Sequence, residues 1–152
     1  MNNIKEIDLR FGYKSEEEIH KYLENYFGEL LRTSENEDMG KYYEFDKYND
    51  KVYLEIKTRR INHNQYSSLM FGQNKLIKGR ELKRANPAVR IFFIFRCLDG
   101  VYYWELDASE HTIQFSGRTD RGRDERCDMV HIKTENLKSL DSFSLALYLS
   151  NS

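Results

Sequence analysis

Three residues in the first half of the chain, Asp46, Glu55 and Lys57, have side chains suited to phosphodiester chemistry. Two carboxylates that share a site repel each other, and a hard divalent cation with oxygen ligands relieves that repulsion. A lysine on the same surface can hold a phosphate or a hydroxide while the cation polarises phosphorus. The residue types therefore indicate a metal-dependent site. The alternative is that they form only the solvated face of an amphipathic hairpin.

The segment that carries these residues, YYEFDKYNDKVYLEIKTRR at 42–60, alternates apolar with polar side chains. This alternation predicts strands over 42–48 and 52–58, joined by a tight turn at Asn49-Asp50. In that register Asp46 faces Tyr53, so Asp46 and Glu55 become diagonal neighbours, about 7–8 Å apart at the backbone. Because side chains alternate between faces, the hairpin has one apolar and one polar face. The apolar face would carry Tyr43, Phe45, Val52, Leu54 and Ile56, and the polar face Glu44, Asp46, Glu55 and Lys57.

An amphipathic helix is predicted before the hairpin, over 15–32. Ser15 and Glu18 form a capping box at its start. The apolar stripe that follows at 3.6-residue spacing is Ile19, Leu23, Tyr26, Phe27, Leu30 and Leu31. Of three consecutive glutamates only Glu16 lies on this stripe, so we expect it to point toward whatever the helix packs on. A carboxylate there needs a partner, unless it serves only as a helix cap, which is the alternative.

The pattern of Asp46 followed by Glu55-x-Lys57 resembles the active-site hairpin of the PD-(D/E)xK nuclease superfamily, with Phe45 in place of the usual proline. In members that resemble archaeal Holliday junction resolvases, an acidic residue at this place in the first helix joins the metal site. The matching residue here is Glu16. The resemblance implies a Mg²⁺ or Mn²⁺ site. Its ligands would be Asp46, Glu55, the backbone carbonyl of Ile56 and, directly or through a water, Glu16.

The same resemblance assigns roles around that site. Lys57 would lower the pKa of the attacking water and stabilise the charge that develops on phosphorus. Arg59, Gln73 and Lys75 are candidates for contacts with nucleic acid, and basic residues over 75–84 would hold flanking phosphates. The alternative for each candidate is an ordinary surface or packing residue.

The region 63–84 has a helical pattern whose phase is ambiguous, because Gly72 and Gly79 interrupt it. One helix from Tyr66 would place Leu69, Met70, Gln73 and Ile77 on a common face. A helix that restarts after Gly72 would instead group Lys75, Lys78 and Leu82. Both readings end before Pro87, because the residue before a proline is pushed out of the helical region.

The remaining elements are mostly strands. The run VRIFFIFRC at 89–97 is apolar on both faces, which predicts a strand covered on both sides. Asp99-Gly100 predicts a hairpin into a strand over 101–106. Further strands are expected at 112–115 and 129–133, and a helical segment at 134–149. The loop 117–128 mixes four arginines with four acids and either contacts a nucleic-acid backbone or forms salt bridges.

Composition limits the remaining possibilities. The 152 residues, with a net charge of −1, fit one domain with a real core. Cys97 and Cys127 indicate neither a disulfide framework nor a zinc site. No signal peptide or membrane-spanning run is evident, so we expect an intracellular protein, cytoplasmic or nuclear, that is not secreted and has no membrane partner. Residues 57–96 hold ten Lys and Arg against one acid, Glu81, which suits a phosphate-tracking surface unless the acidic flanks pair with them.

The order helix, hairpin, helix, strand, strand matches the α-β-β-α-β core that the resemblance implies. We therefore expect a restriction-endonuclease-like α/β fold over about 15–106, with a mixed central sheet flanked by helices. A β/α extension would follow over 107–152 within the same domain. The implied activity is Mg²⁺-dependent endonuclease cleavage of nucleic acid, with DNA favoured, and a homodimer would suit the cutting of two strands.

Two other functions remain as alternatives to a nuclease, and the structure of the nucleic-acid substrate remains open. The chain could be a catalytically silent nucleic-acid-binding module of the same fold, or a protein-interaction domain that uses tyrosines of 42–53 and 102–103. The substrate could be linear duplex, a branched junction, a flap or RNA.

Overall fold

The computed structural model describes residues 16–32, 45–116 and 127–142. Within these ranges it contains two α-helices and two β-sheets. The helices are α2 (Glu16–Phe27) and α3 (Gln73–Ala85). The strands are β1 (Leu31–Arg32), β2 (Lys47–Tyr48), β3 (Val52–Thr58), β4 (Ser68–Gly72), β5 (Arg90–Cys97), β6 (Gly100–Glu105), β7 (Thr112–Ser116), β8 (Cys127–Lys133) and β9 (Lys138–Ser139). Two 3₁₀ turns, η4 (Thr134–Asn136) and η5 (Leu140–Ser142), flank β9.

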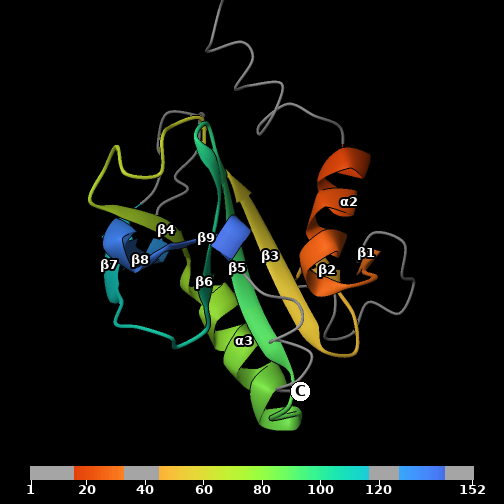
Figure 1. Cartoon of the computed structure of the whole chain (residues 1–152). Coiled ribbons are helices and arrows are strands. Elements are labelled where there is room, and N and C mark those ends of the chain that lie inside the picture. The colour runs from red at the N-terminus through yellow and green to blue at the C-terminus, as the bar shows by residue number, and fades with distance from the viewer. Residues whose placement is uncertain (1–15, 33–44, 117–126, 143–152) are drawn as a thin grey trace, which may run out of the picture.

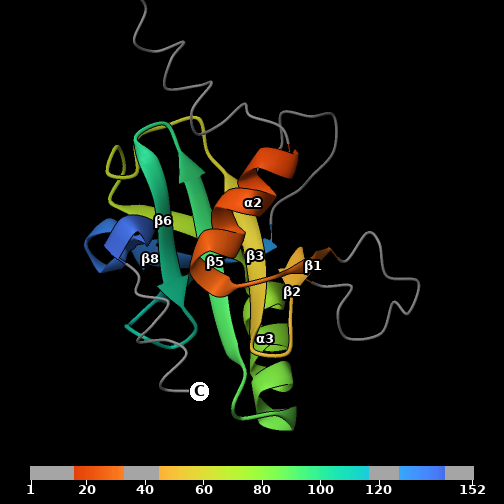
Figure 2. The ribbon, with the colours of Figure 1, turned by 45° about the vertical axis from the view of Figure 1, so that its right-hand side comes forward.

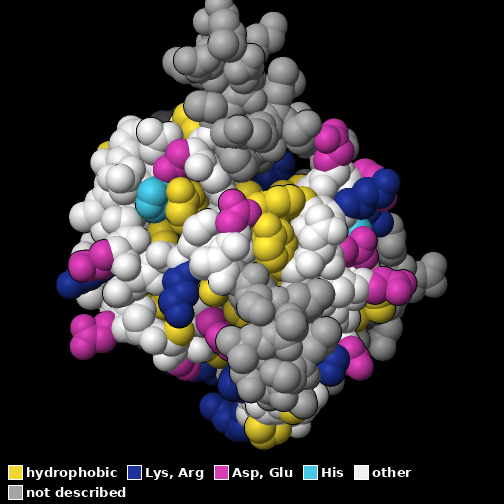
Figure 3. All heavy atoms as spheres, in the orientation of Figure 1, with side chains coloured by type: hydrophobic (Ala, Val, Ile, Leu, Met, Phe, Trp, Pro, Cys, Tyr) yellow, Lys and Arg dark blue, Asp and Glu magenta, His cyan; other side chains and the backbone are white. Residues whose placement is uncertain are grey.

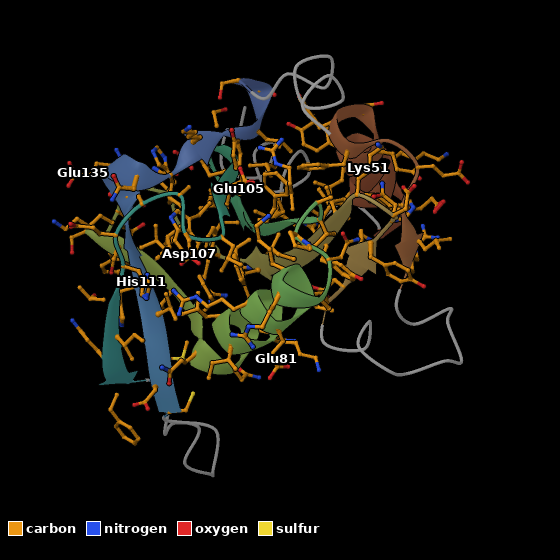
Figure 4. The ribbon with its side chains drawn as sticks, turned by 90° about the horizontal axis from the view of Figure 1, so that it is seen from below. Lys51, Glu81, Glu105, Asp107, His111 and Glu135 are labelled. Atoms are coloured by element: carbon orange, nitrogen blue, oxygen red, sulfur yellow. The ribbon has the colours of Figure 1, made fainter. Side chains whose placement is uncertain are left out.

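The larger sheet has the strand order β1-β2-β3-β5-β6-β9 and is mixed. Strands β3 and β5 are parallel neighbours, whereas β2 pairs with β3 and β6 pairs with β5 in the antiparallel sense. Helix α3 lies in the connection between β3 and β5, as a parallel pair requires. Figures 1 and 2 show α2 on one side of β3 and β5, and Figure 4 shows α3 on the other side. The expected mixed sheet flanked by helices is thus present.

Both faces of the larger sheet are buried. On the α2 face, Leu23 and Phe27 pack with residues of β3 and β5. The strand residues are Val52, Leu54, Phe92 and Ile94. On the α3 face, Leu76 and Leu82 pack in a cluster with Tyr53, Phe71, Phe93, Phe95 and Trp104. Every residue of β5 except Arg90 is buried, which confirms the prediction of a strand covered on both sides.

A second sheet, β4-β8-β7, was not predicted as a sheet. Its strands β7 and β8 contain the expected strands at 112–115 and 129–133. The helical interpretation of 63–72 is wrong, because 68–72 forms β4 and pairs with β8. The helix restarts after Gly72, as in the second of the two phases, and ends at Ala85 before Pro87.

Two further boundaries differ from the predictions. The first helix stops at Phe27 instead of 32, because Gly28 adopts φ +80° and its amide closes the helix on Glu24 O. The next residues, Leu31–Arg32, form β1 and pair with β2. The helix expected at 134–149 is replaced over 134–142 by the two 3₁₀ turns and β9. The rest of that segment, residues 42–44 of the hairpin and most of the 117–128 loop lie outside the described residues.

Neither described helix is both long and apolar enough to cross a membrane.

Candidate active site

The β2–β3 hairpin brings Asp46 to the middle of β3. Tyr48 pairs with Tyr53 and Lys47 with Leu54, and the Asp46 carboxylate accepts a hydrogen bond from the Ile56 amide at 2.7 Å. This register is two residues away from the expected one, in which Tyr53 faced Asp46. The paired residues of β2 end at Lys47, and Asp46 lies near enough to Glu55 for its charge to raise the Glu55 pKa.

Asn49 sets this register. Its side-chain oxygen accepts hydrogen bonds from the amides of Lys51 and Val52, at 2.8 and 2.9 Å. Its side-chain amide donates to the carbonyls of Phe27 and Glu29 at the end of α2, at 3.1 and 2.9 Å. Asn49 is therefore the first residue of the turn, and the turn centre moves from Asn49-Asp50 to Asp50-Lys51. Side chains along a strand alternate between the two faces of the sheet. A shift of two residues in the pairing of β2 with β3 therefore leaves each β3 side chain on its expected face.

The polar face of the hairpin is not solvated as a whole. Glu55 is 4% exposed and Tyr53 is 7% exposed, because α3 and the second sheet cover this side. Phe45 was expected on the Val52 and Leu54 face, but it packs against Tyr53 and Phe93 on the α3 face. It precedes the first paired residue of β2, so strand alternation does not fix its direction. Glu55 therefore does not belong to a merely solvated face of the hairpin, which was the alternative interpretation.

Glu55 lies between two lysines. Lys57 Nζ is 3.3 Å from Oε2, and Lys75 Nζ, from the first turn of α3, is 3.5 Å from Oε1. Oε1 is buried, and no described residue makes a hydrogen bond to it. Burial raises the pKa of Glu55, and the Asp46 carboxylate raises it further, while the two lysines act in the opposite direction. The site thus holds a carboxylate whose charge is only partly compensated.

Close packing of α3 places Lys75 at this carboxylate. Gly79 faces the sheet, where an added Cβ would meet Ile91 Cγ2 at 3.2 Å and the Phe45 ring at 3.6 Å. With Leu76 and Leu82 buried on the same side, the helix approaches closely enough for Lys75 to extend over the Phe45 ring, 6.0 Å from its centroid. The sequence indicated Lys75 only as a nucleic-acid contact. Its contact with Glu55 depends on where the helix starts, which the pattern alone left open.

The residues at this place suit a hard divalent cation. Asp46 and Glu55 supply carboxylate oxygens, one of which lacks a hydrogen bond. The N–H and C=O of one residue in an extended strand point to the same side. Since the Ile56 amide points at Asp46, its carbonyl faces that side as well. Two carboxylates and a carbonyl with retained waters are an ordinary Mg²⁺ ligand set. No group of three or more His, Cys, Asp or Glu residues that could hold a metal occurs among the described residues.

Glu16 is not placed at this site by the structure. It begins α2 as expected, but its side chain lies outside the described part of the chain. The helix packs through Ile19 and Leu23 on the Val52 and Leu54 face of the sheet, opposite to the face that carries Glu55.

The three expected nucleic-acid contacts occupy different settings. Gln73 begins α3. The Arg59 guanidinium donates to the carbonyls of Met70 and Thr58, at 3.0 and 3.2 Å, and so helps fasten β4 to the end of β3. Burial lowers the pKa of Arg59. Lys75 contacts Glu55, as described above.

Much of the basic central segment is paired with acids. Arg80 contacts Asp107 at 2.6 Å and Arg90 contacts Glu105 at 2.7 Å. On the face drawn in Figure 3, Lys and Arg side chains lie among Asp and Glu without forming a separate patch. Ion pairs thus offset part of the positive charge of 57–96, whereas Arg59 and Lys83 donate to backbone carbonyls.

The chain matches a known protein family. A family model described as “Phage putative PDDEXK endonuclease” matches residues 12–140. Searches of curated proteins and of solved structures find no match.

Proposed function

Because the chain belongs to the phage PDDEXK endonuclease family, we propose that it is a divalent-metal-dependent endonuclease that hydrolyses phosphodiester bonds in nucleic acid, with DNA as the favoured substrate. The observation that carries this proposal is the meeting of Asp46, Glu55 and Lys57 at one place, where a buried Glu55 oxygen has no hydrogen bond from any described residue. An unsatisfied buried carboxylate oxygen is costly for folding, and such groups concentrate at functional sites.

Asp46, Glu55 and the Ile56 carbonyl would hold Mg²⁺ or Mn²⁺. When bound, the cation supplies Lewis-acid polarisation of the phosphoryl group and compensates its negative charge. The Ile56 amide fixes the Asp46 carboxylate at 2.7 Å, so that carboxylate is oriented before any ligand arrives. Asp46 is exposed and therefore open to an incoming ion, whereas the surroundings of Glu55 exclude water.

Lys57 is the candidate for handling the attacking water. Its ammonium lies 3.3 Å from Glu55 and its side chain is 29% exposed, so it can face both the carboxylate and an incoming phosphodiester. A positive charge there would lower the pKa of the attacking water and stabilise charge that develops on the phosphoryl oxygens. Glu16 stays proposed as the residue that orients this water.

Arg59, Gln73 and Lys75, with the basic residues of α3, stay proposed as contacts to the flanking phosphates. A homodimer would carry two copies of the site and could cut both strands of a duplex. Of the tyrosines named for the protein-interaction alternative, Tyr48 and Tyr53 are each only 7% exposed, whereas Tyr102 and Tyr103 are partly exposed.

Cleavage assays test the proposal. Labelled linear duplex, branched DNA, single-stranded DNA and RNA are incubated with increasing Mg²⁺ or Mn²⁺. We expect metal-dependent cleavage of at least one DNA substrate, and a loss of about 100-fold or more in Asp46→Asn and Lys57→Ala. Asp50→Asn is the matched control, since it makes the same chemical change at the exposed turn of the same hairpin. Undiminished cleavage by Asp46→Asn and Lys57→Ala would refute the proposal. Salt-sensitive binding without cleavage would favour the silent binding module.

A further inference from the structure

Building on the proposed function, we propose that Lys75 is a built-in counter-ion of Glu55 that competes with the divalent cation for the Glu55 carboxylate. Lys75 Nζ is 3.5 Å from Oε1, the oxygen that makes no hydrogen bond with any described residue. This is also the oxygen that remains available to a cation. In the metal-free protein Lys75 partly compensates the buried negative charge of Glu55. Without Lys75, no ammonium group of a described residue would lie near Oε1.

The charge balance around Glu55 supports competition. Asp46 and Glu55 carry two negative charges, and Lys57 and Lys75 carry two positive charges within this set. The metal-free set is thus neutral, although negative charge is the property that attracts a divalent cation. A cation that binds there adds two positive charges next to two ammonium groups, and like charges in a site of low dielectric repel strongly. Removing one ammonium group should therefore strengthen metal binding.

When a cation binds, Lys75 can move away from the Glu55 carboxylate more easily than Lys57 can. Lys57 is held two residues from Glu55 on the same face of β3, so its backbone position relative to the carboxylate is fixed by the strand. Lys75 reaches Glu55 from a different element, with its long side chain crossing the Phe45 ring. Its side chain is 20% exposed, so the ammonium has a route toward solvent or toward a nucleic-acid phosphate. The same lysine can thus neutralise Glu55 first and contact substrate afterwards.

Metal affinity, measured without nucleic acid, tests this inference. Mn²⁺ is titrated by calorimetry into the full chain as wild type, Lys75→Gln and Lys78→Gln. Lys78 is the matched control: it lies one turn further along α3 and pairs with Glu81 at 3.6 Å, whose side chain points away from the sheet in Figure 4. We expect Lys75→Gln to bind Mn²⁺ about tenfold more tightly than wild type, because it removes one ammonium charge that repels the cation. Lys78→Gln should stay within about twofold of wild type.

Thermal unfolding gives a second readout that does not depend on activity. In EDTA, Lys75→Gln should have a lower Tm than Lys78→Gln, because Glu55 has lost a counter-ion, and saturating Mn²⁺ should raise its Tm more than that of wild type. If Lys75→Gln does not fold, Lys75→Met is measured instead. Methionine also removes the ammonium group, but its long apolar side chain can still pack on the Phe45 ring.

The outcomes separate the two proposals. Equal or weaker Mn²⁺ binding by a folded Lys75 variant, with wild type binding Mn²⁺, overturns the competition while leaving the proposed function intact. A wild-type protein that binds no Mn²⁺ overturns the proposed function and this inference together.

Discussion

Glu55 and Glu105 lie on opposite faces of the same sheet, and both face basic side chains. Glu105, on β6, receives two hydrogen bonds from the Arg90 guanidinium, at 2.7 and 2.8 Å, and uses both carboxylate oxygens. Glu55, on β3, has lysine ammonium groups at 3.3 and 3.5 Å, and one of its oxygens makes no hydrogen bond to a described residue. Glu55 is also the more deeply buried, with a side-chain exposure of 5% against 28% for Glu105.

The difference separates a carboxylate whose two oxygens both accept hydrogen bonds from one that keeps a buried oxygen without a hydrogen bond from any described residue. A bidentate pair with arginine is geometrically complete and adds no binding capacity. A buried carboxylate with partial compensation costs stability and keeps an oxygen available. Charge and strand position alone would not separate these two glutamates, because each lies on a strand near basic residues.

The largest expected effect is on cleavage. Glu55→Gln should reduce metal-dependent DNA cleavage by about 100-fold or more, since it removes a charged ligand from the site. Glu105→Gln makes the same chemical change on the other face and should leave the rate within about twofold of wild type. Rates are compared under single-turnover conditions at saturating Mg²⁺. Similar losses in both variants would remove the functional distinction between the two glutamates.

A smaller effect, of opposite sign in the two variants, is expected for stability without metal. Glu55→Gln removes an incompletely compensated buried charge and should raise the free energy of unfolding by about 1 kcal/mol. Glu105→Gln weakens a partly exposed ion pair and should lower it by about 1 kcal/mol. For a chain of this size such changes correspond to Tm shifts of about 2–4 °C, measurable by calorimetry in EDTA. A destabilised Glu55→Gln would mean that the two lysines compensate this carboxylate fully.

The smallest expected effect is on the pH dependence of stability. Burial and the Asp46 carboxylate raise the pKa of Glu55 above its ordinary value of 4.5. Between 4.5 and the raised value, the folded protein keeps a proton that the unfolded chain has lost, so the free energy of unfolding falls as pH increases through this window. The contribution is absent in Glu55→Gln and retained in Glu105→Gln. Urea unfolding in EDTA across this pH range measures it, and identical slopes in wild type and Glu55→Gln would contradict the assignment.

Local patterns in the sequence determined most of the elements near the site. Period-two alternation predicted β3 with its bounds, and the continuous apolar run predicted a fully covered β5. Together with the helix before the hairpin, the Asp46, Glu55 and Lys57 pattern indicated the family that the match over 12–140 shows. These signals are local, because they depend on side-chain alternation and on residues a few positions apart.

Tertiary contacts decided the rest. The hairpin register depends on Asn49, whose side chain is tied to the end of α2 some twenty residues earlier, so turn propensity alone placed the turn one residue too early. The chain at 68–72 became a strand because β8, more than fifty residues later, pairs with it. Burial of Glu55 and its contact with Lys75 arise only when α3 packs through Gly79 onto the sheet. Sequence alone thus supplied the chemical groups, and long-range packing determined their partners, because energies of burial and pairing depend on neighbours that are remote along the chain.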